Sequence, residues 1–318
     1  MKIVILDGNT MGEDIDFSPI KKIAETVVYG SSTAEECAQR ICDADVVILN
    51  KVQLTAEILE NAKNLKLVCI FAVGYNNIDV DYCKAHNILV RNVPGYCTQS
   101  VCQHTFALLF ALMENVRYYD DFVKMGKYSK SGVANHLGKA FCEIAGKKWG
   151  IIGMGAIGRA VADCAAAFGA EVRYTSVSGT ERKEKYPHLS LDELLKTSDI
   201  ITLSTPLNEK TYHLIGEKEL ASLKDGAYII NVSRGAVIDE DALAYVIDNG
   251  NIGGVGIDVY SQEPPSSDMK LMNVKNTDKV IFTPHIAWAS VEARRRNVQI
   301  TADNITAFIN GEEHNDVW

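Results

Sequence analysis

The sequence predicts an α/β protein with two doubly wound, parallel-sheet domains, and three observations lead to this fold class. Short β-branched runs alternate with helical patterns through most of the chain, which is typical of parallel βα repeats. The strand-like runs are apolar at nearly every position, which indicates strands buried on both faces. The length of 318 residues suits about two domains of ~150 residues each.

The first segment, to about residue 98, is a βα repeat without a phosphate-binding glycine turn. Its strand-like runs are KIVILD at 2–7, DVVILN at 45–50 and LKLVCIFA at 65–72. Helical patterns lie between these runs at 32–44 and 54–64. Each helical pattern has a Ser or Thr near its start that suits the N-cap position.

The rest of the chain begins with a long apolar helix, expected at 98–126 after the Pro94-Gly95 turn, and a polar connection or arm at 126–146. The strand–helix alternation then resumes. Further strands are expected at 148–154, 171–176, 199–205, 227–233, 253–259 and 279–284. Helices are expected at 156–169, 239–250 and 290–311.

Composition and charge argue against several classes of partner. The chain is 47% hydrophobic and 23% charged, within the ordinary globular range, and its net charge is −9. An acidic chain offers no basic face for phosphates, so no nucleic-acid partner is expected. No apolar run approaches the ~20 residues of a membrane span. The run at 2–7 is too short for a signal sequence, which predicts a cytoplasmic protein.

The cysteines fit a reducing compartment. All eight lie in apolar periodic stretches without a CxxC pair, at 37, 42, 69, 83, 97, 102, 142 and 164. This pattern favours buried free thiols over disulfides or metal ligands, and no metal site is expected.

The run WGIIGMGAIGRAVA at 149–162 predicts a dinucleotide site. A GxGxxG match alone is weak evidence, but this one follows an apolar strand and opens an Ala-rich helix, as the motif requires. Gly153 would make the tight turn, Gly155 would admit the pyrophosphate, and Gly158 would let helix and strand pack closely. The helix N-terminus would supply amide donors and a positive dipole end. The alternative is a structural strand–turn–helix without a ligand.

The acid that usually holds a ribose 2′-hydroxyl is missing. About 20 residues beyond the turn, where that acid is expected, the chain reads Tyr174-Thr175-Ser176. Hydroxyls can donate to a 2′-phosphate that an Asp or Glu would repel. Residues that suit a phosphate follow at Ser178, Gly179, Arg182, Lys183 and Lys185. This pattern favours NADP or dual use, and strict NAD use with solvated cations stays open.

Arg234, Glu263 and His285 follow three late strands. Because ligands bind beyond the carboxyl ends of strands in an open α/β sheet, we expect these side chains at one rim. A guanidinium can bind the carboxylate and carbonyl of a 2-keto acid. An imidazole can protonate the carbonyl oxygen after hydride delivery, and a paired carboxylate can orient that ring. Each residue alone is more often structural, but the set points to catalysis.

The chain resembles the D-isomer-specific 2-hydroxyacid dehydrogenases over nearly its whole length. The segments that carry the resemblance are VGYNNID, NVPGYCTQSVCQHTFALL, GIIGMGAIG, PLNEKTYHLIG, INVSRGAVIDEDAL, GGVGIDVYSQEPP and TPHIAWAS. The resemblance implies a flavodoxin-like substrate domain of residues 1–100 plus 289–318 and a Rossmann cofactor domain of residues 101–288. It also implies NAD(P)(H) as cofactor and a homodimer built on the helix and arm at 100–146.

The resemblance further implies a role for each site residue. Arg234 would bind substrate, His285 would be the general acid/base, and Glu263 would tune His285. The amides of Val73 and Gly74 would take the substrate carboxylate, with a buried strand-to-turn connection as the alternative. The implied cofactor-binding set is Gly153, Gly155, Ala156, Ile157, Gly158, Thr175, Ser176, Thr205, Pro206, Val232, Ser233, Asp258 and His285.

NKVQLTAEIL around Lys51 and HIAW around Trp288 look most like the glycerate dehydrogenase/hydroxypyruvate reductase branch. Lys51 would face a polar substrate or be an exposed cation, and Trp288 would shape the pocket mouth or only pack. The expected reaction is reduction of a small 2-keto acid, such as hydroxypyruvate or glyoxylate, to the D-2-hydroxy acid. A non-catalytic dinucleotide sensor and a formate or phosphite oxidiser stay open as alternatives.

Overall fold

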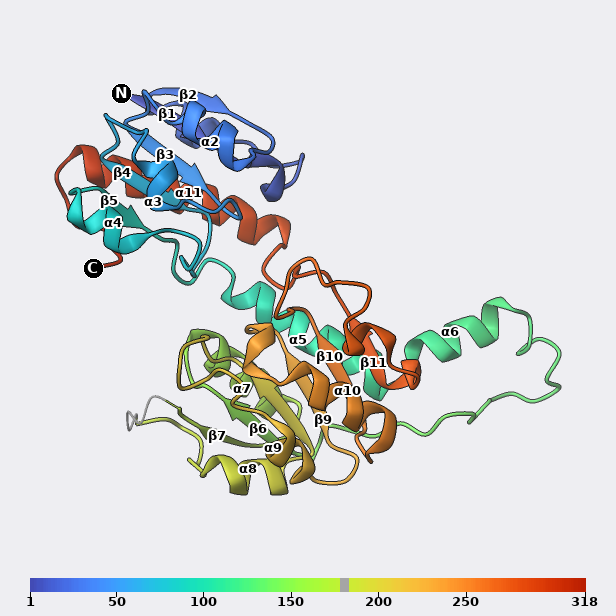
Figure 1. The fold of residues 1–318 in the computed structure, drawn as a ribbon. Coiled ribbons are helices and arrows are strands. Elements are labelled where there is room, and N and C mark those ends of the chain that lie inside the picture. Colours follow the sequence, from blue (N-terminus) through green and yellow to red (C-terminus); the bar gives the residue numbers. More distant parts are fainter. Residues whose placement is uncertain (178–182) are drawn as a thin grey trace. The chain divides into compact units, whose positions relative to one another are not determined.

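The computed structural model describes residues 1–177 and 183–318, and the chain divides into two compact units (Figure 1). Unit 1 comprises Met1–Cys97 and Trp288–Trp318, and unit 2 comprises Thr98–Ala287. The division expected from the sequence placed residues 98–100 in the first domain and Trp288 in the second. Each unit contains one parallel β-sheet, which confirms the predicted fold class.

Unit 1 has a five-stranded sheet in the order β2-β1-β3-β4-β5. Its strands are β1 (Lys2–Ile5), β2 (Glu25–Val28), β3 (Val46–Leu49), β4 (Leu67–Ile70) and β5 (Leu89–Arg91). All neighbouring pairs are parallel, and the order is that of flavodoxin-like folds. Apolar runs did not predict β2 and β5, because both are edge strands and no residue of β2 is fully buried.

Helices surround this sheet and one of them comes from the far end of the chain. They are η1 (Gly8–Met11), α1 (Ser18–Lys21), α2 (Ala34–Arg40), α3 (Ala56–Leu59), α4 (Val80–Ala85) and α11 (Val291–Ile309). Thr33 caps α2 through a capping box with Glu36, as the N-cap pattern predicted. The helix α11 packs against β4 and α1, where Val298, Ala302 and Ile305 enter the apolar core.

Unit 2 has a six-stranded sheet in the order β11-β10-β9-β8-β6-β7. Its strands are β6 (Lys148–Ile152), β7 (Glu171–Thr175), β8 (Ile200–Leu203), β9 (Tyr228–Asn231), β10 (Gly254–Ile257) and β11 (Val280–Phe282). Beyond β7, His188 forms a parallel bridge with Tyr174. The sheet therefore follows the order of a Rossmann fold, with its third strand reduced to this bridge.

Unit 2 also contains helices, two groups of which cover its sheet. They are α5 (Thr98–Met113), α6 (Val116–Lys124), α7 (Ala156–Ala167), α8 (Leu191–Thr197), α9 (Glu217–Ala221), α10 (Glu240–Asn249), η2 (Gly235–Val237), η3 (Lys270–Asn273) and η4 (Thr277–Lys279). The helices α5 and α7 pack on each other, and α5 also contacts β9, β10 and β11. A separate apolar cluster joins Leu194, Leu220 and Ile247 of α8, α9 and α10 to the sheet.

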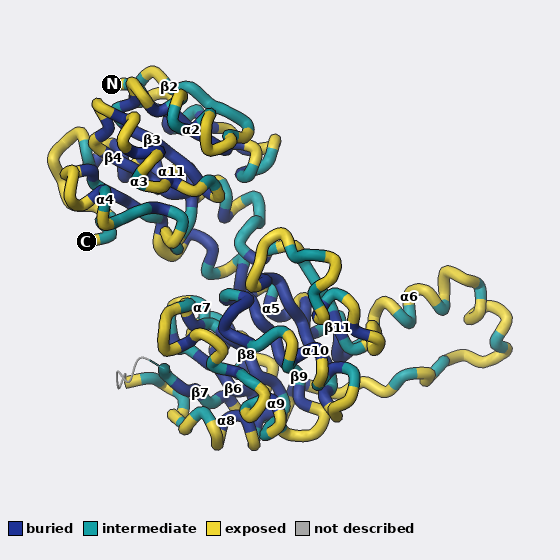
Figure 2. Tube along the Cα trace, in the orientation of Figure 1, coloured by how far each residue is buried: buried dark blue, intermediate teal, exposed yellow. Residues whose placement is uncertain are grey.

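The prediction of a single helix at 98–126 is wrong, because the structure contains the two helices α5 and α6 in this range. The chain breaks at Asn115, whose φ of 51° is left-handed. No residue of α6 is buried, and Figure 2 shows α6 and the following arm mostly in the colours of exposed and intermediate residues, in contrast to the dark-blue strands. Asparagine adopts the left-handed conformation more readily than most residues, so the chain can turn at this position, where the buried part of the helical segment ends.

The expectation that all thiols are buried is wrong for Cys42, Cys142 and Cys164, which are exposed. Cys42 lies beyond the end of α2, Cys142 lies in the arm, and Cys164 lies on α7, where its Sγ is 3.7 Å from the Sγ of Cys102 on α5. The other five are buried free thiols, as expected. Among the described residues, no helix is both long and apolar enough to span a membrane.

Candidate active site

The turn between β6 and α7 has the geometry of a phosphate-binding turn. Gly153 has a φ of 97°, and a Cβ there would lie 2.8 Å from the Ser204 carbonyl oxygen. A Cβ on Gly158 would lie 2.1 Å from the Gly153 oxygen, so only glycine fits either position. Gly155 is the N-cap of α7 and would meet no atom within 4 Å. The open N-terminus of this 12-residue helix therefore fits a pyrophosphate.

Other members of the predicted cofactor set border this turn. Ala156 and Ile157 begin α7. The Gly153 amide donates a hydrogen bond to the Thr175 backbone carbonyl over 3.0 Å. Thr205 and Pro206 follow β8, which pairs with β6 on the side away from β7. Ligands of open α/β sheets bind at such a switch point, where successive connections diverge.

The region expected to face the ribose 2′ position contains no acid at the end of β7. Thr175 is buried, and Ser176 is half-buried. The expected contributions of Ser178, Gly179 and Arg182 lie outside the described residues.

Two ion pairs involve charged groups that follow β7. Lys185 lies 3.4 Å from an Asp163 carboxylate oxygen and above the ring of Tyr186. Glu184, whose side chain is only 9% exposed, accepts two hydrogen bonds from Arg159 over 3.1 and 2.7 Å. The hydrogen bond with Glu184 raises the pKa of Arg159. Glu184 is therefore neutralised, whereas Lys183 is exposed.

Arg234 lies in a loop that the side chain of Asn231 closes. The Asn231 oxygen accepts hydrogen bonds from the Ser233 amide and hydroxyl over 3.0 and 2.8 Å. Its side-chain nitrogen donates to the Arg234 carbonyl over 3.0 Å. Arg234 is half-buried and donates to the Ser233 carbonyl over 2.8 Å, while Val232 is buried beside it. These bonds fix the guanidinium at the end of β9.

The loop of Arg234 is in direct backbone contact with the loop that carries Glu263. A Cβ on Gly235 would lie 1.9 Å from the Tyr260 carbonyl carbon and 2.1 Å from the Ser261 nitrogen. The strands β9, β10 and β11 are neighbours, so Arg234, Glu263 and His285 follow adjacent strand ends.

His285 and Glu263 form a hydrogen-bonded pair. The His285 Nδ1 lies 2.6 Å from the Glu263 Oε2, and the side chains are 24% and 32% exposed. The other carboxylate oxygen accepts a hydrogen bond from the Tyr260 amide over 3.1 Å. The backbone therefore holds Glu263 while Glu263 orients the imidazole. Burial raises the pKa of Tyr260 to about 12, so its hydroxyl stays protonated and donates to the Thr283 carbonyl over 3.0 Å.

Asp258 holds the turn in which His285 sits. His285 has a φ of 55°, a left-handed conformation that costs a non-glycine residue roughly 1–2 kcal/mol. Its amide donates to the Asp258 carbonyl over 2.7 Å. The amides of Ile286 and Ala287 each donate to the Asp258 carboxylate over 2.8 Å. The sequence assigned Asp258 only to the cofactor, and the structure adds this support of the His285 turn.

In unit 1, the side chain of Asp7 holds the turn that carries Lys51. Lys51 follows β3 and is exposed. The buried Asp7 carboxylate accepts hydrogen bonds from the amides of Asn50, Lys51 and Val52 over 2.9, 2.6 and 3.1 Å. Burial raises the pKa of Asp7, against the effect of these amides. The backbone amides of the turn at Lys51 are therefore hydrogen-bonded to the Asp7 carboxylate.

The other residues expected in unit 1 differ in exposure. Val73 follows β4 and is 43% exposed, so the alternative of a buried connection is wrong at this position. Gly74 is half-buried. Trp288 packs edge-on against Tyr96 and contacts the apolar core of unit 1, so it has a packing role.

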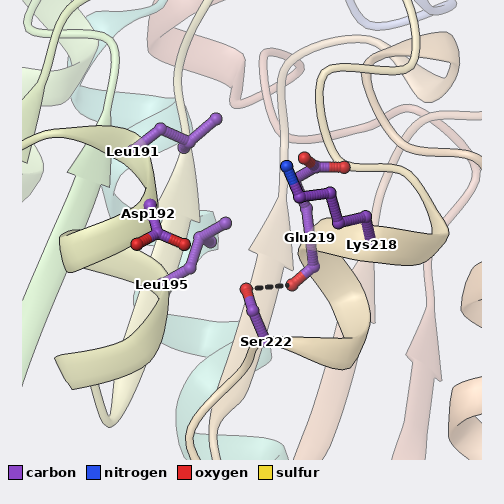
Figure 3. A pocket seen from close by; sticks show the side chains of 6 residues that line it. All are labelled: Leu191, Asp192, Leu195, Lys218, Glu219 and Ser222. Atoms are coloured by element: carbon purple, nitrogen blue, oxygen red, sulfur yellow. Dashed lines mark hydrogen bonds between the residues drawn. The ribbon is translucent and has the colours of Figure 1, made fainter.

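A hollow between α8 and α9 is distinct from these predicted residues (Figure 3). Leu191, Asp192 and Leu195 face Lys218, Glu219 and Ser222 across it. The Ser222 hydroxyl donates to its own helix at the Glu219 carbonyl, and Asp192 pairs with Lys196. The hollow contains none of the predicted site residues.

Comparison with known proteins identifies the family. The sequence model of the D-isomer specific 2-hydroxyacid dehydrogenase, NAD binding domain, matches residues 106–287. A hydroxypyruvate reductase from Blautia hydrogenotrophica is 36% identical over 323 residues, covering 100% of this chain and 99% of that protein. This chain belongs to the D-isomer-specific 2-hydroxyacid dehydrogenase family.

Solved structures resemble the dehydrogenase over its whole length. An acyclic imino acid reductase in complex with NADPH and D-Arg has a TM-score of 0.88 and 31% identity, covering 100% of both chains. A D-lactate dehydrogenase from Aquifex aeolicus, complexed with NAD and lactic acid, has a TM-score of 0.86 and 31% identity, covering 100% and 99%. The dehydrogenase is an oxidoreductase with a Rossmann domain for a nicotinamide dinucleotide.

Two supporting residues of the dehydrogenase were not singled out from the sequence. Asn231 and Gly235 lie within the motif INVSRGAVIDEDAL, beside Arg234. The motif therefore contained the signal, but their roles as a loop clamp and a close backbone contact depend on atoms brought in by folding.

Proposed function

We propose that the dehydrogenase reduces a small 2-keto acid, such as hydroxypyruvate or glyoxylate, to the D-2-hydroxy acid with NAD(P)H. The observation that carries this proposal is the 2.6 Å pair of His285 and Glu263, next to the strand end that carries Arg234. The similarity to the hydroxypyruvate reductase supports the substrate class. A pure dinucleotide sensor has no need for an oriented acid.

Each residue has a distinct role in the proposed reaction. Arg234 binds the substrate carboxylate and polarises the carbonyl. The nicotinamide cofactor, when bound, supplies the hydride. Negative charge develops on the carbonyl oxygen, and His285 protonates that oxygen from the ring nitrogen opposite Glu263. Glu263 keeps the ring oriented during this transfer.

The proposed contacts in the two units are assigned separately. In unit 1, Lys51 and the amides of Val73 and Gly74 bind substrate, while Trp288 shapes the pocket mouth through its packing. In unit 2, the dinucleotide pyrophosphate binds at the open N-terminus of α7. The wider contact set consists of Gly153, Gly155, Ala156, Ile157, Gly158, Thr175, Ser176, Thr205, Pro206, Val232, Ser233, Asp258 and His285.

A matrix of keto acids against NADH and NADPH tests the reaction. Purified protein is expected to oxidise at least one reduced cofactor with hydroxypyruvate or glyoxylate. His285→Ala is expected to abolish turnover, whereas cofactor binding, measured by fluorescence, is retained because the other members of the contact set remain. Reduction of NAD⁺ or NADP⁺ by formate or phosphite in a parallel assay, with no activity toward keto acids, would favour the oxidiser alternative. Cofactor binding without any turnover would favour the sensor.

We infer a preference for NADP or use of both cofactors, because the end of β7 carries Thr175 and Ser176 in place of an acid. Thr175→Asp is expected to shift the ratio of kcat/KM values toward NADH, since a carboxylate accepts from a ribose diol and repels a 2′-phosphate. Thr175→Asn is the matched control, because it has nearly the shape of Thr175→Asp without the charge and is expected to leave this ratio nearly unchanged. Equal responses of both cofactors to Thr175→Asp would show that the hydroxyls do not select the cofactor.

We also propose a homodimer built on α5 and the arm. The helix α6 and the arm carry exposed apolar side chains, which include Val123 of α6 at 54% and Leu137 and Phe141 of the arm at 84% and 55%. Exposed apolar side chains within one segment are typical of an interface. Leu137→Asp is expected to shift the molar mass in light scattering toward that of one chain; an unchanged dimer mass would place the interface elsewhere. Cytoplasmic location stays a prediction from the sequence.

A further inference from the structure

A second histidine, His104 of α5, lies behind the turn that carries the candidate general acid. Its Nε2 lies 3.0 Å from the Thr283 hydroxyl, although the two residues are 179 positions apart. The Thr283 hydroxyl lies 2.6 Å from the Asp258 Oδ1, and His104 Nε2 is 3.6 Å from that oxygen. Neither His104 nor Thr283 contributes to the mechanism proposed above.

The direction of these hydrogen bonds follows from donor counting. A threonine hydroxyl has one hydrogen, and Asp258 can only accept when ionised. The Thr283 hydrogen is therefore used on Asp258, and His104 must donate from Nε2 to the Thr283 oxygen. The result is a chain of hydrogen bonds from His104 through Thr283 to Asp258, and such chains strengthen their members.

The series of hydrogen bonds that starts at His104 ends at the backbone around His285. Asp258 is fully buried, so a lost donor to its carboxylate is not replaced by bulk water. The same carboxylate accepts the amides of Ile286 and Ala287, and these bonds hold His285 at its positive φ. A rotation of the carboxylate would therefore move the imidazole that faces Glu263.

We propose that His104 is a positioning residue for His285, acting through Thr283 and Asp258. This inference rests on the proposed role of His285. The helix α5 suits such a role, because it packs across β9, β10 and β11, whose ends carry Arg234, Glu263 and His285. His104 thereby ties the catalytic turn to the longest helix of unit 2.

Paired variants separate this role from simple packing. His104→Leu removes the donor, whereas His104→Gln keeps a donor at a similar reach. Thr283→Val removes the hydroxyl, whereas Thr283→Ser keeps it. Loss of a hydrogen bond in the chain to a buried carboxylate predicts at least about a tenfold lower kcat for His104→Leu and Thr283→Val. The conservative partners are expected within about threefold of the unmodified enzyme, and the cofactor Kd within about twofold for all four.

A readout without keto acid keeps this test independent of the proposed reaction. Diethyl pyrocarbonate modifies accessible imidazole rings, and the rate of this reaction at His285 reports the orientation and exposure of its ring. The rate is followed by peptide mass, with His285→Ala as the control that assigns the modified peptide. We expect this rate to change at least about threefold in His104→Leu and Thr283→Val and to be restored in His104→Gln and Thr283→Ser. If the unmodified protein turns over no keto acid, the proposed function fails while this rate still tests the positioning role. Equal rates in all variants, or equal changes within each pair, would overturn the role of His104.

Discussion

Glu263→Gln removes the charge of the carboxylate that faces His285. The amide has nearly the same shape but only one acceptor oxygen, so it keeps the hydrogen bond from the Tyr260 amide or the one from the His285 Nδ1, and not both. The Nδ1–Oε2 distance of 2.6 Å indicates a charge-assisted hydrogen bond, and such bonds contribute about 1.5–3 kcal/mol. The side chains are 24% and 32% exposed, so solvent screening favours the lower part of that range, about 1.5–2 kcal/mol. At 1.36 kcal/mol per factor of ten, kcat/KM for the keto acid is expected to fall about 10- to 30-fold.

The assay is the decrease in absorbance of the reduced nicotinamide under steady-state conditions, together with the cofactor Kd. Glu240→Gln is a matched control, because Glu240 also lies beside this loop and bonds the Ser261 amide without contacting His285. We expect the control to keep kcat/KM within about twofold and both variants to keep the cofactor Kd. The reasoning is refuted if Glu263→Gln is as active as the unmodified enzyme, or if Glu240→Gln loses the same activity.

Three further predictions concern packing, a buried ion pair and thiol reactivity. Gly235→Ala places a methyl group against the backbone that leads to Glu263. It should therefore lower the free energy of unfolding, measured in urea, by about 1–3 kcal/mol and also reduce kcat. An unchanged midpoint of urea unfolding would contradict this contact. Asp316→Ala leaves the buried Arg91 guanidinium without its carboxylate partner at 2.6 Å and should lower the free energy of unfolding by about 3 kcal/mol. A loss below about 1 kcal/mol would show that the backbone carbonyls of Asn304 and Glu312 are enough to stabilise the buried guanidinium. Burial raises the pKa of Cys69 to about 12, so at about pH 8 only roughly one Cys69 thiol in ten thousand is ionised. In the native protein, the exposed Cys42 should therefore be alkylated before Cys69, which should react only after unfolding. Equal alkylation rates of the two cysteines in peptide mass maps would argue against this burial.

The sequence by itself determined the features that depend on neighbouring residues. Continuous apolar runs located the buried strands β3 and β4, since a strand buried on both faces needs apolar side chains at every position. The spacing from Gly153 to Gly158 located the turn before α7, because a tight turn and close helix packing both exclude larger residues. Motifs at strand ends located Arg234, Glu263 and His285, because parallel strands deliver their ends to one edge.

The tertiary structure decided what depends on residues far apart in the chain. Edge strands such as β2 have no strong apolar pattern, because only one of their sides pairs with the sheet. The break at Asn115 lies where the buried part of the helical segment ends, which the apolar run alone did not reveal. The link from His104 to Asp258 through Thr283 arises only when α5 folds across the ends of the strands. Hydrogen bonds of this kind depend on distances between atoms, and no local pattern of residues encodes them.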